Sequence, residues 1–232
     1  MIVLALDTSS RAGSVAVVHD DVVRVELVGH PAFTHGQRLP LELQRALEEG
    51  GTTIEAVNLF AVIAGPGSFT GLRVGIATIQ GLAMAMGRKV VAVSALEAIA
   101  RAAAGATHGA TGAWMDAQRG EVFAALYAAD ARSMLIEPVA APPAAVLESW
   151  STRMNLSGIT FAGDGAIRYG DVITKHAGPA ASIVDGPPLA AIAGRIAASA
   201  PSRATLPHAI VPLYVRKSDA ELARARREQG AR

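Results

Sequence analysis

The sequence contains no cysteine, and aromatic residues make up only 4% of it. The lack of cysteine excludes disulfides and thiolate metal sites, and it suits a cytoplasmic protein. No apolar run reaches the roughly 20 residues that a membrane-spanning helix needs, and residues 1–7 lack the basic start of a signal peptide. The formal net charge is only +1, so the chain has no electrostatic footprint of a protein that binds nucleic acid alone. These absences predict a soluble cytoplasmic protein with no membrane partner and an aliphatic core.

The most informative stretch is 65–75, Gly-Pro-Gly-Ser-Phe-Thr-Gly-Leu-Arg-Val-Gly, which lies between two apolar runs. The run before it, 59–64, is short and bounded by glycine, as a buried strand is, whereas 76–86 is long enough for a helix. The glycines therefore indicate a strand-to-helix turn, with Ser68 or Thr70 capping the helix. The spacing matches neither a Walker A loop nor a dinucleotide fingerprint. From spacing alone we favour a structural turn over an anion site.

The first half of the chain is patterned as βββαβαβα. Strands are expected at 2–6, 15–18, 22–28, 59–64 and 90–93, and helices at 39–47, 76–86 and 96–104. An α/β order of this kind is typical of one lobe of the actin-like, sugar-kinase-like (ASKHA) fold.

A loop near 105–112 predicts a boundary between an N-terminal lobe, 1–106, and a C-terminal lobe, 107–232. The second lobe is expected to be a related but abbreviated βββαβαβα unit. Its expected parts are a hairpin at 113–116 and 122–128, a proline-rich connection at 138–143, a strand at 159–162, a helix at 189–200 and a basic terminal helix at 219–227. That last helix could pack back on the first lobe.

Acidic residues follow expected strands in both halves. Asp7, Thr8 and Ser9 follow the first strand, Asp116 ends a strand of the second half, and Gly163 and Asp164 follow another. In actin-like ATPases an acid in the first position coordinates the metal of a nucleotide, so these residues could form a nucleotide cleft. Aspartate is also an ordinary turn former, and both interpretations stay open.

Other catalytic signals are weak. No two histidines are three or four residues apart, so no helical metal pair is predicted. Neither Ser9 nor Ser68 lies in a Gly-x-Ser-x-Gly elbow, so no hydrolase nucleophile is indicated. We expect no catalytic residue, metal or cofactor.

The helix at 74–86 is apolar around nearly its whole circumference, which indicates burial on all sides or a partner interface. Small residues recur four apart along it and would let another helix approach closely. The predicted interface combines this helix with the preceding one: Leu39, Leu43, Leu47, Gly71, Val74, Gly75, Thr78, Ile79, Leu82, Ala83 and Met86. Burial against the chain's own sheet is the alternative, and both can hold if one face points inward and the other outward.

Four segments resemble the bacterial TsaB (YeaZ) family, which is related to TsaD and carries the older label glycoprotease. They are Asp7-Thr8-Ser9, the stretch 65–75, Asp-Ala-Gln-Arg-Gly-Glu-Val-Phe at 116–123, and Pro-Leu-Tyr-Val-Arg at 212–216. The resemblance implies an actin-like two-lobed fold and a role in making threonylcarbamoyladenosine beside the tRNA anticodon. It also implies TsaD as a partner through the first two helices, the ATPase TsaE in a larger complex, tRNA contact only through that complex, and a homodimer when the chain is alone.

The resemblance further implies that the chain is not an enzyme. TsaD-like proteins carry Asn-His-Leu-Glu-Ala-His after the fifth strand, and the two histidines bind the catalytic metal. Residues 94–99 here read Ser-Ala-Leu-Glu-Ala-Ile, so Ala95 and Ile99 stand at the ligand positions without a donor atom. A noncatalytic scaffold for TsaD is therefore favoured. The alternative is an actin-like-fold ATPase or phosphotransferase that uses Asp7, and a peptidase is least favoured.

Overall fold

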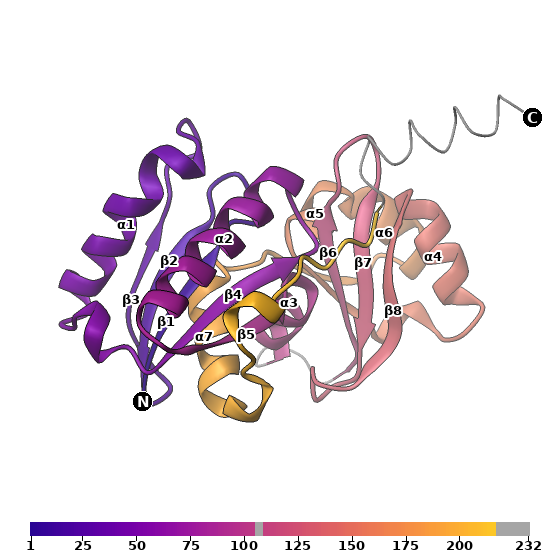
Figure 1. The fold of residues 1–232 in the computed structure, drawn as a ribbon. Helices are drawn as coiled ribbons and strands as arrows, with labels where there is room; N and C mark the ends of the chain where they lie inside the picture. The colour runs from indigo at the N-terminus through magenta and orange to yellow at the C-terminus, as the bar shows by residue number, and fades with distance from the viewer. Residues whose placement is uncertain (105–108, 217–232) are drawn as a thin grey trace, which may run out of the picture.

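The computed structural model describes residues 1–104 and 109–216, which form two five-stranded sheets with helices against them (Figure 1). The first half contains strands β1 (Ile2–Asp7), β2 (Ser14–His19), β3 (Val22–Val28), β4 (Leu59–Gly65) and β5 (Lys89–Ser94), helices α1 (His35–Glu49), α2 (Phe69–Ala85) and α3 (Ala95–Ala103), and the short 3-10 helix η1 (Ile54–Ala56). The order βββαβαβα predicted for this half is confirmed.

The first sheet has the strand order β3-β2-β1-β4-β5. Strand β1 runs antiparallel to β2 and parallel to β4, which in turn runs parallel to β5. The β2–β3 turn is tight because Asp20 and Asp21 adopt positive φ values of 47° and 70°, a conformation that aspartate tolerates better than most residues. Because β1 and β4 are neighbouring parallel strands, their carboxyl ends lie together at one edge of the sheet.

The second half repeats this topology. It contains β6 (Thr111–Asp116), β7 (Val122–Tyr127), β8 (Met134–Ala141), β9 (Thr160–Ala162), β10 (Ser182–Val184), α4 (Pro143–Ser151), α5 (Asp164–Arg168), α6 (Gly170–Ala177) and α7 (Ala190–Ser199), with 3-10 helices η3 (Leu156–Gly158), η4 (Pro201–Arg203) and η5 (Pro207–Ala209). The sheet order is β10-β9-β6-β7-β8. When this order is read from β8 to β10, each strand corresponds to the strand at the same place in the first sheet. The shortening expected of this lobe falls on β9 and β10, which have three residues each.

One expectation for the second half is wrong. The first part of the proline-rich connection expected at 138–143 belongs to strand β8. Pro138 is tolerated because β8 is an edge strand of its sheet. On the open side of an edge strand there is no neighbouring strand to accept a hydrogen bond, so the N–H that proline lacks is not needed there. The pairing of β7 with β8 also shifts register between Ala124 and Leu126.

The last helix of each half packs on the sheet of the other half. Helix α3 lies against β6 and β7, whereas α7 lies against β1, β2 and β4. Together they fill an apolar core between the two sheets, which includes Val3, Ile63, Ile99, Met115 and Ile196. The expected lobe boundary falls in 105–108, and the terminal helix expected at 219–227 falls in 217–232; both lie outside the described residues.

The outer face of each sheet is covered by its own helices. Helices α1 and α2 cover the first sheet through a core that includes Leu6, Leu43, Phe60, Ile76 and Ile79. Helices α4 to α6 cover the second through a core in which Trp114, Trp150 and Phe161 pack ring against ring. Among the helices described, none is both long and apolar enough to cross a bilayer.

Candidate functional site

A cleft of about 1090 Å³ lies between the two lobes. Its walls come from the turn after β1, the segment before α1, the β4–α2 turn, the end of β6 and the C-terminal residues 213–216. Several of these segments follow carboxyl ends of sheet strands, which is where ligands bind in open α/β sheets. The acids predicted from the sequence lie at or beside this cleft.

Asp7 ends β1, and its carboxylate is occupied within its own turn. Oδ1 of Asp7 accepts hydrogen bonds from the backbone N–H of Ser9 at 2.7 Å and from its hydroxyl at 2.6 Å. Burial raises the pKa of Asp7, and the two Ser9 hydrogen bonds and the charge of Arg38 oppose that rise. This is an Asx-type turn, so the geometry agrees with the turn-forming interpretation.

Thr8 is fully buried beneath helix α2, and its hydroxyl oxygen has no hydrogen-bond partner in the described structure. A Cβ at Gly71 would collide with the Thr8 carbonyl oxygen, and one at Gly75 would collide with the Thr8 hydroxyl. These glycines of the 65–75 stretch therefore let the helix start directly against the β1 turn.

The start of α2 is fixed by Ser68 and not by Thr70. The Ser68 hydroxyl accepts a hydrogen bond from the amide of Gly71 at 3.2 Å, and the Ser68 amide donates to the carbonyl of Ser9 at 2.7 Å. The expected cap is confirmed at Ser68, and the same residue ties the β4–α2 turn to the β1 turn.

Helix α1 holds the β1 turn from the other side. Arg38 donates to the carbonyl oxygens of Arg11 and Ala12 and forms an ion pair with Glu42 at 2.7 Å. The His35 ring lies 3.0 Å from the carbonyl of Ser10, and burial together with Arg38 lowers the pKa of His35. The sequence did not indicate either residue, because both precede the helix expected at 39–47, and nothing in that polar stretch predicts that α1 begins at His35 and contacts the β1 turn.

The two acids of the second lobe are joined to each other. Asp164 accepts a hydrogen bond from the backbone N–H of Asp116 at 3.1 Å, and the Asp116 carboxylate is held by Gln118 at 2.8 Å and Arg168 at 3.0 Å. Burial raises the pKa of Asp164; the Asp116 and Gly165 amides oppose the rise, and the carboxylates of Asp116 and Asp185 add to it.

A second, smaller cavity of about 230 Å³ brings together some of the predicted residues. It is lined by Asp7 and Ser9 from the first lobe and by Gly163 and Asp164 from the second, whereas Asp116 lines the large cleft. Gly163 has a φ of 109°, and a Cβ there would collide with the Trp114 carbonyl. Within residues 1–104 and 109–216, no group of three or more His, Cys, Asp or Glu side chains is placed to hold a metal ion.

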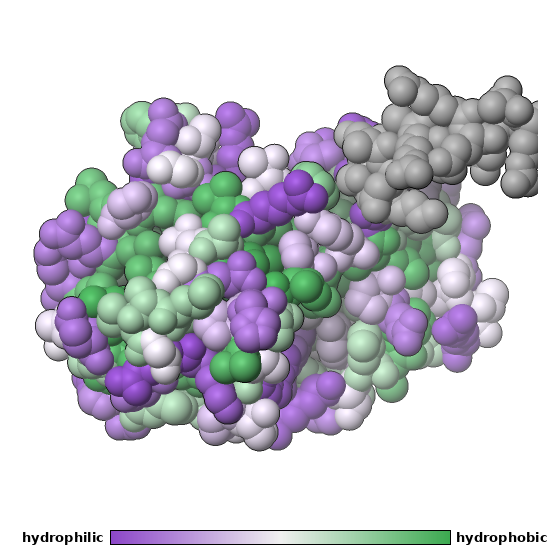
Figure 2. Space-filling model, in the orientation of Figure 1, coloured by the Kyte–Doolittle hydropathy of each residue, from purple (hydrophilic) through white to green (hydrophobic). Residues whose placement is uncertain are grey.

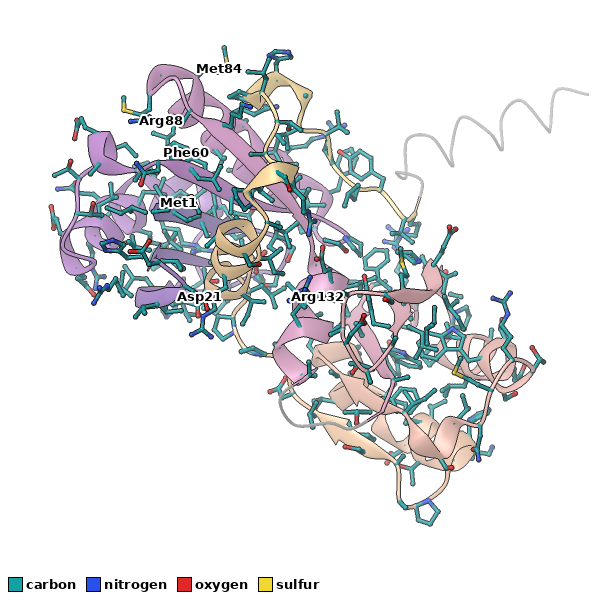
Figure 3. All side chains as sticks on the ribbon, turned by 90° about the horizontal axis from the view of Figure 1, so that it is seen from below. Met1, Asp21, Phe60, Met84, Arg88 and Arg132 are labelled. Atoms are coloured by element: carbon teal, nitrogen blue, oxygen red, sulfur yellow. The ribbon has the colours of Figure 1, made fainter. Side chains whose placement is uncertain are left out.

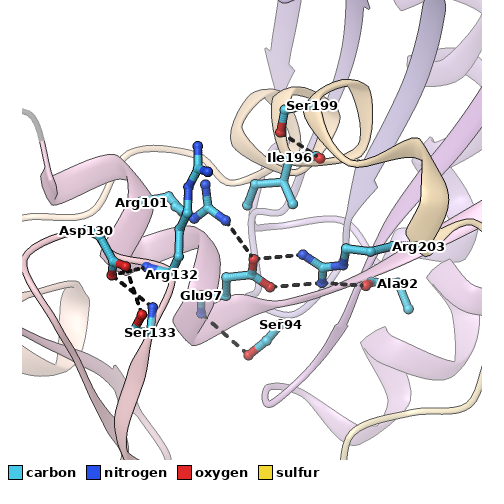
Figure 4. Close-up of polar contacts among 10 residues, drawn as sticks. All are labelled: Ala92, Ser94, Glu97, Arg101, Asp130, Arg132, Ser133, Ile196, Ser199 and Arg203. Atoms are coloured by element: carbon cyan, nitrogen blue, oxygen red, sulfur yellow. Dashed lines mark hydrogen bonds and ion pairs between the residues drawn. The ribbon is translucent and has the colours of Figure 1, made fainter.

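Residues 94–99, which were compared above with the metal-binding motif of TsaD, contribute to packing and to an ion pair. Ala95 and Ile99 of α3 are buried between the lobes. Glu97, between them in sequence, accepts from Arg203 at 2.8 and 3.0 Å and from Arg101 at 3.4 Å (Figure 4). Its carboxylate thus joins α3 to η4.

The predicted partner-binding residues fall into two groups. Those buried in the first lobe are Leu39, Leu43, Gly71, Gly75, Ile79 and Ala83, and those half-buried along its surface are Leu47, Val74, Thr78, Leu82 and Met86. The exposed side of α2 instead carries Ala77, Gly81 and Met84. The buried small residues that indicated an interface therefore lie on the inner face of the helix. Ala77 and Gly81, which are also four residues apart, lie on its outer face.

The C-terminal segment 211–216 crosses from one lobe to the other (Figure 1). Leu213 donates its backbone N–H to the carbonyl of Ala64 at 2.7 Å in the first lobe. Arg216 donates to the carbonyl of Ala117 at 3.0 Å and to the carboxylate of Glu121 at 2.9 Å in the second. Tyr214 lies between these anchors and lines the cleft.

Two lobes with the same mixed-sheet topology and a cleft between them define an actin-like α/β protein. The model of the family TsaD, described as tRNA N6-adenosine threonylcarbamoyltransferase, matches residues 31–223, and the chain belongs to this family.

Within it, the chain is similar to proteins named TsaB. It is 39% identical over 132 residues to the tRNA threonylcarbamoyladenosine biosynthesis protein TsaB of Escherichia coli, covering 56% of each chain. It is 30% identical over 152 residues to the protein of the same name from Bacillus subtilis, covering 65% of this chain and 64% of that one. The matches thus span less than two thirds of either relative.

A solved structure extends the similarity over nearly the whole chain. YeaZ from Pseudomonas aeruginosa superposes with a TM-score of 0.75 at 29% identity, covering 92% of this chain and 99% of the other. The resemblance and the actin-like fold predicted from the sequence are confirmed.

Proposed function

We propose that this chain is a cytoplasmic, noncatalytic subunit that binds a TsaD-type transferase during the formation of threonylcarbamoyladenosine in tRNA. The names of the Escherichia coli and Bacillus subtilis relatives support the process. In this proposal the chain pairs with the transferase, joins TsaE in a larger complex, and forms a homodimer in the absence of its partner.

The outer face of helix α2 is the observation that carries the proposal. Met84 is 64% exposed, and a Cβ at Gly81 would have no atom within 4 Å. Small and apolar residues at the surface let a second helix approach closely and bury area against it. Figure 2 shows hydrophobic residues over and between α1 and α2, and Figure 3 shows Met84 at the rim of the first lobe, away from the second.

The absence of catalysis is supported by the residues of α3. Ala95 and Ile99 offer no donor atom for a metal, and both are needed where they are because they fill the core between the lobes. The chain would then contribute a surface to the transferase rather than a reactive group.

A substitution at Gly81 tests the interface without disturbing the monomer. Gly81→Arg should abolish co-elution of the chain with purified TsaD from the same cell, because the side chain enters the proposed contact. Gly158→Arg is the matched control, since a Cβ at Gly158 also meets no atom within 4 Å but lies in the second lobe. Unchanged affinity of Gly81→Arg for TsaD would reject the interface. Gly75 and Ala83 are unsuitable for this test because both are buried.

An ATPase or phosphotransferase is the second candidate, favoured by the placement of Asp7 and Asp164 around one cavity between the lobes. It requires ATP turnover by the isolated chain that Asp7→Asn abolishes. Turnover that survives this substitution, or no turnover at all, would leave the scaffold as the better proposal.

A further inference from the structure

Exposed aromatic rings concentrate at one place in this aromatic-poor chain. In the part of the chain that the structure describes, Phe33, Phe69 and Tyr214 are exposed to 57%, 39% and 44%, and all three line the cleft between the lobes. They come from three separate segments: the loop before α1, the first turn of α2 and the C-terminal segment. Burial against the described part of the chain does not explain rings at these positions.

Two of the rings form an ordered platform. Phe69 and Tyr214 are stacked with centroids 5.1 Å apart and planes 26° apart. The guanidinium carbon of Arg73 lies 3.9 Å from the Phe69 centroid, and Nε of Arg73 donates to the Tyr214 hydroxyl at 3.0 Å. The platform therefore combines flat rings with a cation whose other N–H groups form no hydrogen bond with the residues that the structure describes.

The charges of the cleft are divided between its walls. Of the described residues that line the cleft, those of the first lobe include Arg11 and several hydroxyl side chains and no acid, whereas Asp116 and Asp164 lie on the wall from the second lobe. Among the described residues, neither Arg11 nor Arg73 forms an ion pair with a carboxylate. The first-lobe wall thus suits a ligand that has flat rings and negative charges.

We propose that this wall binds unpaired nucleobases of an RNA strand; the inference rests on the proposed role in tRNA modification. Single-stranded RNA is held by aromatic side chains that stack on bases and by arginines that contact phosphates. Phe33 and the Phe69–Tyr214 platform provide the stacking surfaces, and Arg11 and Arg73 the phosphate contacts. Because the contacts are few, the site acts in the complex with the transferase, where other surfaces also hold the RNA.

Fluorescence anisotropy of the full chain, alone and mixed with TsaD, tests the proposal. The probes are a labelled ten-nucleotide single-stranded RNA and a labelled tRNA anticodon stem-loop, with duplex RNA and ATP as competitors. Phe33→Leu and Phe69→Leu should each weaken binding roughly fivefold or more, since leucine keeps apolar area but loses the stacking ring. Tyr214→Phe keeps the ring and should change binding little.

A matched pair of charge variants distinguishes RNA binding at this wall from nonspecific electrostatic attraction of RNA to the protein. Arg73→Gln should weaken RNA binding, whereas Arg153→Gln, an exposed arginine of the second lobe, should not. The proposal is overturned if neither the chain nor its mixture with TsaD binds either RNA, if both leucine variants bind as tightly as wild type, or if the two arginine variants behave alike. Displacement by ATP but not by unlabelled single-stranded RNA would indicate a mononucleotide site instead.

Co-elution with TsaD is measured for the same variants. Phe33→Leu should keep the transferase bound, because Phe33 lies outside the α2 surface proposed for that contact. Loss of RNA binding with TsaD still bound supports both proposals, whereas failure of the wild-type chain to bind TsaD rejects the scaffold role by itself.

Discussion

The side chain of Glu26 in β3 accepts a hydrogen bond at 2.9 Å from the backbone N–H of Ala191 in the first turn of α7. The hydroxyl of Ser14 donates to the same carboxylate oxygen at 3.1 Å and accepts from the amide of Ala190 at 3.0 Å. Leu189, the N-cap residue of α7, provides no side-chain cap. The first sheet therefore caps a helix that comes from the far end of the chain, and the cap orients that helix across the interface between the lobes.

Glu26→Ala should lower the free energy of unfolding by about 1–2 kcal/mol, the usual effect of losing a helix N-cap. Chemical denaturation followed by circular dichroism at pH 7 measures this. Glu137→Ala, at an exposed position of edge strand β8, is the control and should change stability by less than about 0.5 kcal/mol. Equal effects of the two substitutions would mean that the cap contributes nothing.

The sequence was sufficient to predict the strands and helices of the first lobe. The spacing of hydrophobic residues differs sharply between them, and turns with glycine or charged residues separate them. The sequence was insufficient to predict β8, because Pro138 argues against a strand unless the strand is known to lie at the edge of a sheet. The three-residue strands β9 and β10 are likewise too short for a complete pattern; the sequence indicated β9 and missed β10.

In the candidate site, the acidic residues could be predicted from the sequence, but the aromatic residues could not. Asp7 and Asp116 end strands, and Asp164 comes shortly after one, so all three could be found by position. Phe33 and Tyr214 come from loops that are 181 residues apart in the numbering, and only the folded chain brings them to one cleft. The inner and outer sides of α2 could not be told apart from the sequence because both are small and apolar.

Gly75 and Gly81 should respond oppositely to alanine. A Cβ at Gly75 collides with the Thr8 hydroxyl, so Gly75→Ala should destabilise the fold by about 1–3 kcal/mol through overpacking. Gly81→Ala meets open space in the same helix and should stabilise it by up to about 1 kcal/mol through helix propensity. Urea denaturation of the two variants provides the comparison.

The cause of the Gly75 effect can be isolated by a double variant. Thr8→Ala removes a hydroxyl that has no hydrogen-bond partner within residues 1–104 and 109–216, and it should recover part of the stability lost in Gly75→Ala. Strict additivity of the two substitutions would contradict direct contact between these residues.

Asp7→Asn should change how stability depends on pH. Burial raises the pKa of Asp7 above its ordinary 3.8, so the folded chain binds this proton more tightly than the unfolded chain does. The contribution of Asp7 to stability is therefore complete below pH 3.8 and is lost as the pH rises through the raised value. Asparagine keeps an acceptor for Ser9 without the charge.

The variant should accordingly be at least as stable as wild type at pH 7, and its advantage should shrink as the pH falls toward 3.8. Urea denaturation at a series of pH values from 4 to 8 measures the difference. Asp171→Asn, at an exposed position, provides the control. Clear destabilisation of Asp7→Asn at pH 7 would show that the fold uses the negative charge.

The ion pair of Glu97 with Arg203 should be worth more than a surface pair, because its two hydrogen bonds are parallel and Glu97 is only 14% exposed. Arg203 itself is 37% exposed, so solvent weakens the pair, and we expect Glu97→Ala to cost about 1–2 kcal/mol. Glu49→Ala, which breaks the exposed pair with Arg45, should cost less than about 0.5 kcal/mol.

The same substitution has a spectroscopic readout at Tyr127. Burial raises the pKa of Tyr127 to about 12, and the charge of Glu97 adds to that rise. Glu97→Gln removes the charge and keeps most of the volume, so the phenol should ionise at a lower pH in an alkaline absorbance titration of the folded chain. A titration curve that is unchanged while Glu97→Ala still destabilises the fold would mean that Glu97 acts through Arg203 and Arg101 alone, with burial as the sole cause of the high pKa.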